Sequence, residues 1–156
     1  MYRLLRRAAC VLAALTYFAA SAEAVDLQPG LWELTSKVER NGAGSTRQPR
    51  SRCITSKAAD AARAKSNFDM SAIAKARLSA RFGKDACKLV EAKNSQHLVT
   101  WRLRCAGSPG AEQEGTARFD DPRHFVVVIR TSITTRDKTY TSVVTTEGQY
   151  KGECPR

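Results

Sequence analysis

The sequence lacks several motifs that enzymes and nucleotide-binding proteins use. Its 156 residues include only two histidines, which excludes a histidine-rich metal site. There is no glycine-rich loop of the phosphate- or dinucleotide-binding type, and no G-x-S-x-G elbow of the kind that exposes a catalytic serine. These absences argue against a nucleotide-driven activity and against serine hydrolysis, and we expect no resident metal or cofactor.

Long apolar runs are also absent, apart from one near the N-terminus. Ala8–Ala20 is a run of 13 residues interrupted only by Thr16, whereas a membrane-spanning helix needs about 20 apolar residues. Arginines at positions 3, 6 and 7 precede the run, and the small-x-small sequence Ala22–Ala24 follows it. This order is typical of a cleaved secretory signal. We therefore expect residues 1–24 to be removed, leaving a periplasmic or secreted chain that begins at Val25 and has no transmembrane anchor.

Four of the five cysteines remain once the signal is removed. They are Cys53, Cys87, Cys105 and Cys154. An even number of cysteines in a small exported domain predicts two disulfide bonds. The alternatives are a four-thiolate zinc site, which usually has two closely spaced pairs, and a redox centre, which needs a C-x-x-C sequence; neither spacing occurs here.

The pairing of the cysteines can be argued from an expected hairpin. If that hairpin is centred on Asn94, Cys105 lies four residues past the position opposite Cys87. Four residues of strand span about 13 Å, whereas a disulfide needs Cα atoms within about 7 Å of each other. This register favours the pairs Cys53–Cys87 and Cys105–Cys154.

Alternating apolar and polar residues predict a mainly β fold. In Leu31–Arg40, Trp32, Leu34 and Val38 share one face and charged residues occupy the other, which is typical of a half-buried antiparallel strand. Further strands are expected at 46–54, 87–91, 97–105, 115–119, 124–133 and 139–151. We expect residues 25–156 to form one domain, an antiparallel sheet of six to seven strands curled into a sandwich or an open barrel.

The segment 56–84 differs from the rest of the chain. It is rich in Ala, Lys and Arg and poor in β-branched residues, which predicts a short helical excursion from the sheet. Alternation of apolar residues over 72–82 is also compatible with a strand, and we choose the helix. The segment contains two acidic residues and a candidate basic patch of seven, which are Lys57, Arg63, Lys65, Lys75, Arg77, Arg81 and Lys84.

The basic excess limits the choice of partners. The formal net charge of +11 attracts anionic surfaces, through an interaction that salt weakens. Outside the cytosol the candidates are anionic lipid, lipopolysaccharide, acidic glycans or an envelope protein. Nucleic acid is not expected, because no recognition motif accompanies the charge. The alternative is that the charge serves solubility alone.

Two groups of titratable residues could carry chemistry. Asp120, Asp121 and His124 could bind a divalent metal or act as acid and base, but an Asp-Pro step is common turn chemistry and we favour a hairpin turn. His97 could act as a base, but it stands at the end of an expected strand and we interpret it as structural.

Several short sequences together resemble a known family. They are Leu27–Glu33 (LQPGLWE), Cys53–Thr55 (CIT) and Gly148–Cys154 (GQYKGEC), with Trp101 and Cys105 between the last two. In this order they resemble the bacterial exported family called domain of unknown function 3617, along nearly the whole mature chain. The stretch 53–87 departs from it, being longer and more basic than the family's proline-rich connection. The resemblance implies an exported protein with paired cysteines and no established activity, so no catalytic residue is transferred.

These observations favour a small exported, non-catalytic protein that acts as a binding or interaction module. The alternative is a binder of anionic envelope components through the segment 56–84. A small hydrolase is less favoured, because it would rest only on the two histidines and the two neighbouring aspartates.

Overall fold

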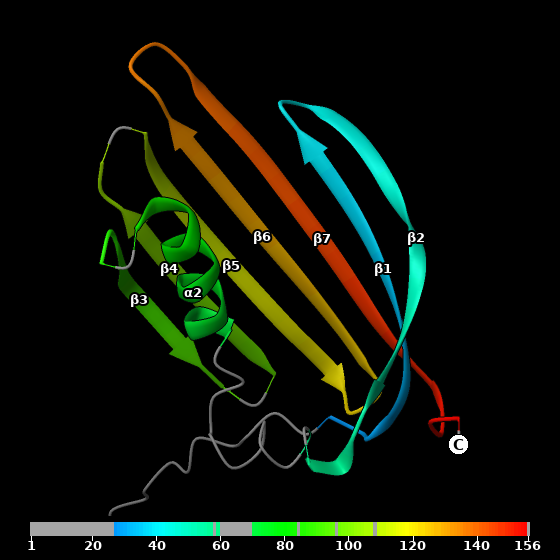
Figure 1. Ribbon diagram of the computed structural model, residues 1–156. Helices are drawn as coiled ribbons and strands as arrows, with labels where there is room; N and C mark the ends of the chain where they lie inside the picture. Colours follow the sequence, from blue (N-terminus) through cyan, green and yellow to red (C-terminus); the bar gives the residue numbers. More distant parts are fainter. Residues whose placement is uncertain are drawn as a thin grey trace, which may run out of the picture.

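A computed structural model describes residues 27–57, 59, 70–83, 85–95, 97–107 and 109–155 (Figure 1). The predicted signal, residues 1–24, lies outside the described residues, as do Arg63, Lys65 and Lys84 of the candidate basic patch. Within the described ranges, no helix has the length and apolar character needed to cross a membrane.

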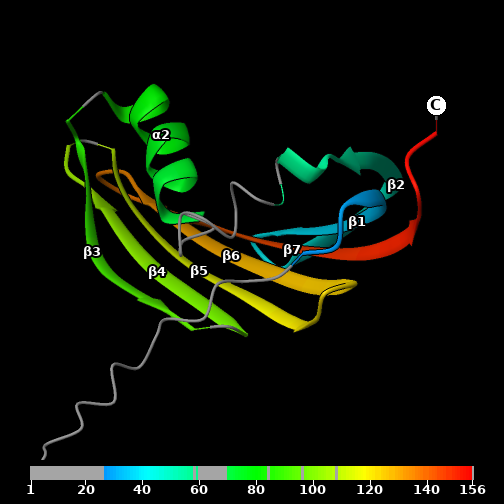
Figure 2. The same cartoon turned by 90° about the horizontal axis from the view of Figure 1, so that it is seen from below.

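The described residues form an antiparallel sheet of seven strands and the helix α2. In chain order the elements are β1 (Gly30–Arg40), β2 (Ala43–Ile54), α2 (Met70–Phe82), β3 (Cys87–Asn94), β4 (Leu98–Cys105), β5 (Gly110–Asp121), β6 (His124–Thr134) and β7 (Thr139–Gly152). Across the sheet the order is β2-β1-β7-β6-β5-β4-β3, so β1 and β7 lie side by side. The sheet curls without closing into a barrel, and β2 and β3 are its edges (Figure 2). The expected mainly β, antiparallel fold is confirmed.

The helix α2 lies inside the curl of the sheet and packs against β3 and β4 (Figures 1 and 2). Ala74 and Leu78, one helical turn apart, are buried and belong to the hydrophobic core. After Phe82 the chain leaves the helix at Gly83, whose φ of 108° accompanies a hydrogen bond from its N–H to the carbonyl of Ser79. The helical interpretation of 72–82 is therefore confirmed, and the helix covers one side of the curled sheet.

Core residues gather on the face of the sheet that α2 covers, because alternate side chains of each strand point to that face. Trp101 in β4 is 3% exposed and lies opposite Gly115 in β5. A Cβ at Gly115 would collide with the Trp101 ring, so the absence of a side chain makes room for the indole. At one end of the sheet the Trp32 ring lies 5.3 Å from that of Phe125 and 6.1 Å from that of Tyr150. These aromatic contacts join β1, β6 and β7.

The hairpin between β1 and β2 turns at Asn41 and Gly42. Their φ angles are 47° and 85°, as a two-residue hairpin turn of type I′ requires. Asn41 also donates its N–H to the carbonyl of Thr141 at 3.0 Å and accepts the Thr141 N–H on its Oδ1 at 3.0 Å. This pair of hydrogen bonds holds the end of β1, including Arg40, against β7.

The disulfide bonds join Cys53 to Cys154 and Cys87 to Cys105. The first bond ties the end of β2 to the chain that follows β7, and the second joins the facing ends of β3 and β4. The prediction of two disulfides is confirmed, but the predicted pairs Cys53–Cys87 and Cys105–Cys154 are wrong.

The β3–β4 hairpin explains this error. The hairpin is not centred on Asn94, because β3 extends through Asn94 and the turn follows it. A β-bulge between Leu89 and Glu91 then shifts the register by one residue. Together the later turn and the bulge bring Cys87 directly opposite Cys105.

Removing the Cys53–Cys154 bond should loosen β2 selectively. β2 is an edge strand with residues 43–53 exposed, held by its pairing to β1 and by this disulfide. We expect Cys53→Ser with Cys154→Ser to raise hydrogen exchange of the β2 amides, while β5 and β6 stay protected. The matched double variant Cys87→Ser with Cys105→Ser should leave β2 exchange unchanged. Equal exchange in β2 for both variants would contradict this role, and non-reducing peptide mapping checks the pairs directly.

Candidate functional site

The two faces of the sheet differ in charge. We call the face that α2 covers the concave face and the opposite one the convex face (Figure 2). Apart from Asp121 in the β5–β6 turn, the strand carboxylates lie on the convex face, each with a cationic partner at 2.8–3.3 Å. They are Glu33, Glu39, Glu91, Glu112, Glu114, Asp120 and Glu147. The negative charge of the convex face is therefore paired locally.

The concave face carries arginines instead. Cross-strand partners share a face of the sheet, so the register places four arginines of β1 and β2 here, and two of α2 stand above it. They are Arg40, Arg47, Arg50, Arg52, Arg77 and Arg81. Among the described residues, no strand carboxylate faces this side, and none of the six arginines forms an ion pair. The residues that the structure describes therefore do not cancel the positive charge of the concave face.

A groove of about 300 Å³ lies between α2 and the concave face. Its apolar walls include Leu78 from the helix, Trp101 from β4 and Ile129 from β6, and Arg77 and Arg81 line it from the helix. The cavity volume is in the lower range of small-molecule sites. The groove therefore combines apolar surface with unpaired positive charge.

A second hollow of about 280 Å³ continues the groove toward the ends of β1, β6 and β7. Both cavities share Arg81, Thr131, Ile133 and Ser142, and the second adds Arg40 from β1 and Tyr140 from β7. The mouth of the groove is thus formed by arginines on two sides, one on the helix and one on the sheet.

Two side chains that line the groove hold buried polar atoms without a hydrogen-bond partner. The Trp101 Nε1 and the Gln113 Oε1 are both buried and unpartnered among the described residues. The other end of the Gln113 amide donates its Nε2 hydrogen to Thr131 Oγ1 at 3.1 Å. An unsatisfied buried polar atom costs about 1–3 kcal/mol, and such atoms are rare in folded proteins. Neither atom has accessible surface, so a ligand in the groove reaches them only if neighbouring side chains move.

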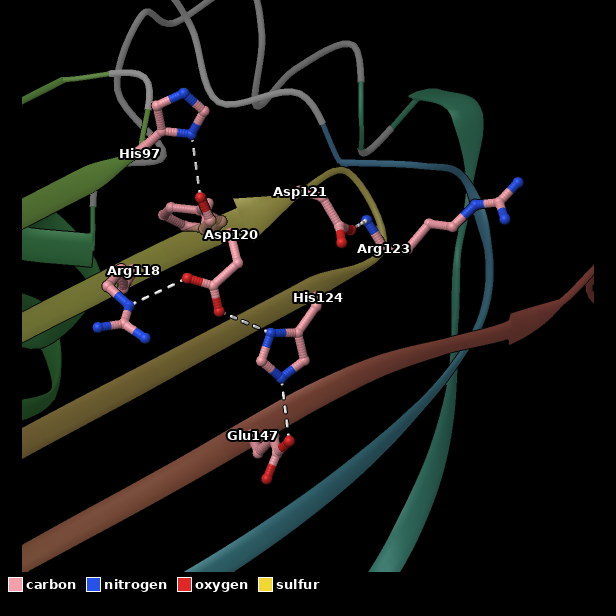
Figure 3. Close-up of polar contacts among 8 residues, drawn as sticks. His97, Arg118, Asp120, Asp121, Arg123, His124 and Glu147 are labelled. Atoms are coloured by element: carbon pink, nitrogen blue, oxygen red, sulfur yellow. Dashed lines mark hydrogen bonds and ion pairs between the residues drawn. The ribbon is translucent and has the colours of Figure 1, made fainter.

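His124 lies in a separate cluster on the convex face (Figure 3). Its Nδ1 is 2.9 Å from Asp120 Oδ2, and its Nε2 is 2.9 Å from Glu147 Oε1. The hydrogen bond to Glu147 raises the pKa of His124 above the ordinary 6.5, desolvation opposes this, and the bond to Asp120 adds to the rise. The imidazolium thus donates to both carboxylates, and no ring nitrogen is left to act as a base.

The remaining candidates near this cluster also have structural partners. Asp121 Oδ1 accepts the backbone N–H of Arg123 at 2.6 Å, as expected of an aspartate in a hairpin turn. The His97 Nδ1 lies 3.1 Å from the carbonyl oxygen of Phe119 (Figure 3). Within the described ranges, no group of three or more His, Cys, Asp or Glu side chains is placed to hold a metal ion. The sequence singled out His124 and Asp120 but not Glu147. Only the register between β6 and β7 places Glu147 next to His124.

The structure separates the residues of the candidate basic patch. Arg77 and Arg81 line the groove, whereas Lys57 and Lys75 are exposed and do not line it. The sequence interpretation missed Arg40 and the arginines of β2, which lie outside the segment 56–84. Strand alternation could have placed Arg50 and Arg52 on one face of β2, but only the strand order brings that face toward the helix.

A comparison with known protein families matches residues 27–154 to the family described as "Protein of unknown function (DUF3617)". The chain belongs to this family. The match covers most of the sequence and confirms the resemblance seen in the sequence landmarks. No curated protein and no solved structure matches the chain. Membership in DUF3617 carries no activity with it, so a functional conclusion has to come from the groove and its charges.

For this DUF3617 protein, the His124 cluster predicts a pH-dependent stabilisation. Because the pKa of His124 is raised in the folded state, its hydrogen bonds contribute fully to the free energy of unfolding below about pH 6.5. This contribution is lost as the pH rises through the raised pKa. We expect His124→Gln to lower the free energy of unfolding by at most about 1 kcal/mol at pH 6, as for other exposed pairs, and by less at pH 9. Urea unfolding at both values measures this.

A variant of the partner provides the control. In Glu147→Gln, as in His124→Gln, the free energy of unfolding should differ less between pH 6 and pH 9 than it does in the wild type. The reason is that the hydrogen bond to Glu147 is the largest cause of the raised His124 pKa. A loss of stability in His124→Gln that is equal at both pH values would show that packing, not the charged hydrogen bonds, accounts for the effect.

Proposed function

We propose that the protein is an exported, non-catalytic binding module that holds an anionic ligand in the groove between α2 and the concave face. The observation that carries the proposal is the set of arginines on this face, beside which the described part of the chain places no carboxylate. Arginine is the residue best suited to hold carboxylate or phosphate groups, because it offers several donors in a fixed plane. The groove supplies a bounded space next to these donors.

The charge pairing on the opposite face also supports a ligand in this place. The carboxylates of the opposite face are already paired, so they compete little with a ligand for the arginines. Catalysis is not favoured, because the one clustered histidine is bonded at both ring nitrogens and lies on the other face of the sheet.

This proposal replaces the segment 56–84, as the binding surface for an anionic envelope partner, with a more limited site. Of the residues in that segment, Arg77 and Arg81 line the groove, and Arg40 joins them from β1. The site is then a groove shared between helix and sheet, and its ligand can be smaller than a membrane surface.

The anionic fluorescent probe 8-anilinonaphthalene-1-sulfonate tests the site. We expect saturable binding to the folded protein at neutral pH, weakened by salt because charge contributes to it. Replacing Arg77 and Arg81 by Ser should lower the affinity about tenfold or more. The matched variant Arg104→Ser with Arg118→Ser loses the same charge from the convex face, where both arginines pair with acids, and should bind as the wild type does. Equal loss in both variants, or no binding to the wild type, would contradict the proposal.

Export is tested separately. We expect protein recovered from the periplasm or the medium to begin at Val25, because Ala22–Ala24 follows a short apolar run. N-terminal sequencing checks this. An intact Met1 in the recovered protein would contradict cleavage. Two disulfide bonds are compatible with an oxidising compartment.

A further inference from the structure

The floor of the groove changes from apolar to polar between two neighbouring rows of residues. Each row runs across the strands, because cross-strand partners share a face. The apolar row consists of Val38, Val144, Ile129, Gly115 and Trp101. The next row toward the β6–β7 hairpin consists of Arg40, Ser142, Thr131 and Gln113 on β1, β7, β6 and β5, and it ends at the buried Leu103 of β4. A ligand that follows this floor along β1, β5, β6 or β7 meets apolar surface first and polar groups two residues further along.

The helix repeats this division above the floor. Leu78 is buried in the core and lines the groove next to Trp101 and Ile129. Arg81 lies one turn nearer the end of α2 and lines both cavities, as do Thr131 and Ser142 of the polar row. The helix and the sheet therefore both place apolar residues along the inner part of the groove, and both place polar residues at its mouth.

The mouth suits an anionic head group. Arg40 from the sheet and Arg81 from the helix line the same hollow, and neither pairs with a carboxylate of the described residues. Thr131 and Ser142 add hydroxyl groups between them. Charge-assisted hydrogen bonds from two arginines are the usual way to hold a phosphate or a carboxylate.

The inner part suits a hydrocarbon chain rather than a second charge. Ile129 offers partly exposed apolar surface there, beside the buried Leu78 and Trp101, and burying each methylene of a chain is favourable. A small polyanion would leave this surface unused, and a neutral lipid would leave the arginines unpaired. The volume of about 300 Å³ admits a single chain rather than a folded partner.

We infer that the groove binds a single-chain amphiphile with an anionic phosphate or carboxylate head group. The head group lies between Arg40 and Arg81, and the chain lies on the row of Trp101 and Ile129. This inference rests on the proposed function and specifies the class of ligand for the same groove.

Tryptophan fluorescence offers a direct readout of the inner part. The chain contains two tryptophans, and Trp32 lies in the aromatic cluster with Phe125 and Tyr150. In a Trp32→Phe background the emission comes from Trp101, which lines the groove. We expect dodecyl phosphate, kept below its critical micelle concentration, to change this emission saturably. Octyl phosphate should bind more weakly, and inorganic phosphate at the same concentration should leave the emission unchanged.

Isothermal titration of the wild type gives the same comparison should Trp32→Phe not fold. Dodecyl phosphate should bind at least tenfold more tightly than both inorganic phosphate and the neutral dodecyl maltoside. Arg40→Ser with Arg81→Ser should remove at least tenfold of the affinity for dodecyl phosphate and leave that for dodecyl maltoside unchanged. The matched variant Arg104→Ser with Arg118→Ser should retain wild-type affinity for both.

The outcomes separate this inference from the proposed function. Equal affinity for dodecyl phosphate and inorganic phosphate, with both affinities lost in Arg40→Ser/Arg81→Ser, would contradict the inference of an amphiphilic ligand. The proposed anion-binding site would then still stand. Dodecyl maltoside binding as tightly as dodecyl phosphate would overturn the anionic head group. No binding of the sulfonate probe, of phosphate or of dodecyl phosphate would overturn both.

Discussion

The groove depends on how α2 is fixed to the sheet. Ala74 and Leu78 are buried against the side formed by β3 and β4, and the disulfide between Cys87 and Cys105 joins those two strands at one end. Burying a leucine side chain contributes about 1.5–3 kcal/mol. A 13-residue helix would be marginal alone, so this packing determines where its arginines stand. Because the helix is held on one side of the curl, the exposed Arg77 and Arg81 line the groove.

The separation of charge between the two faces follows from strand alternation. On the convex face the strand carboxylates meet Lys, Arg or His at 2.8–3.3 Å, yet such exposed pairs contribute little to stability. Their larger effect is on the electrostatic field. Since negative charge is absent from the concave strand residues that the structure describes, the arginines there add to one another, and the curled sheet directs their potential toward the groove.

The sequence predicts most of the fold and little of the site. The alternation in Leu31–Arg40 and in the later strands is strong, because one face of each strand is buried and the other is not. The pairing of Cys87 with Cys105 was missed because it depends on a turn position and a β-bulge, which shift the register without changing the alternation on either side. Turn chemistry did identify the β5–β6 hairpin, where Asp121 bonds to the backbone of Arg123.

The groove could not be predicted because its residues come together only through the order of the strands. Arg40 and Arg81 are distant in the sequence and line one hollow only because β1 lies between β2 and β7 while α2 covers β3 and β4.

The sequence landmarks of the family explain the scaffold rather than the ligand. Leu27–Glu33 and Gly148–Cys154 begin β1 and end β7, where Trp32 lies opposite Tyr150. The same ends are tied by the bond from Cys53 to Cys154. These motifs therefore join the first two strands to the last one. Of the landmark residues, Trp101 lines the groove from a buried position in the core. The arginines that would select an anion, Arg40, Arg77 and Arg81, lie outside the landmarks. Shared landmarks among proteins of this fold consequently predict a common curled sheet, while the charge at the mouth of the groove has to be read from each sequence through the register of its strands.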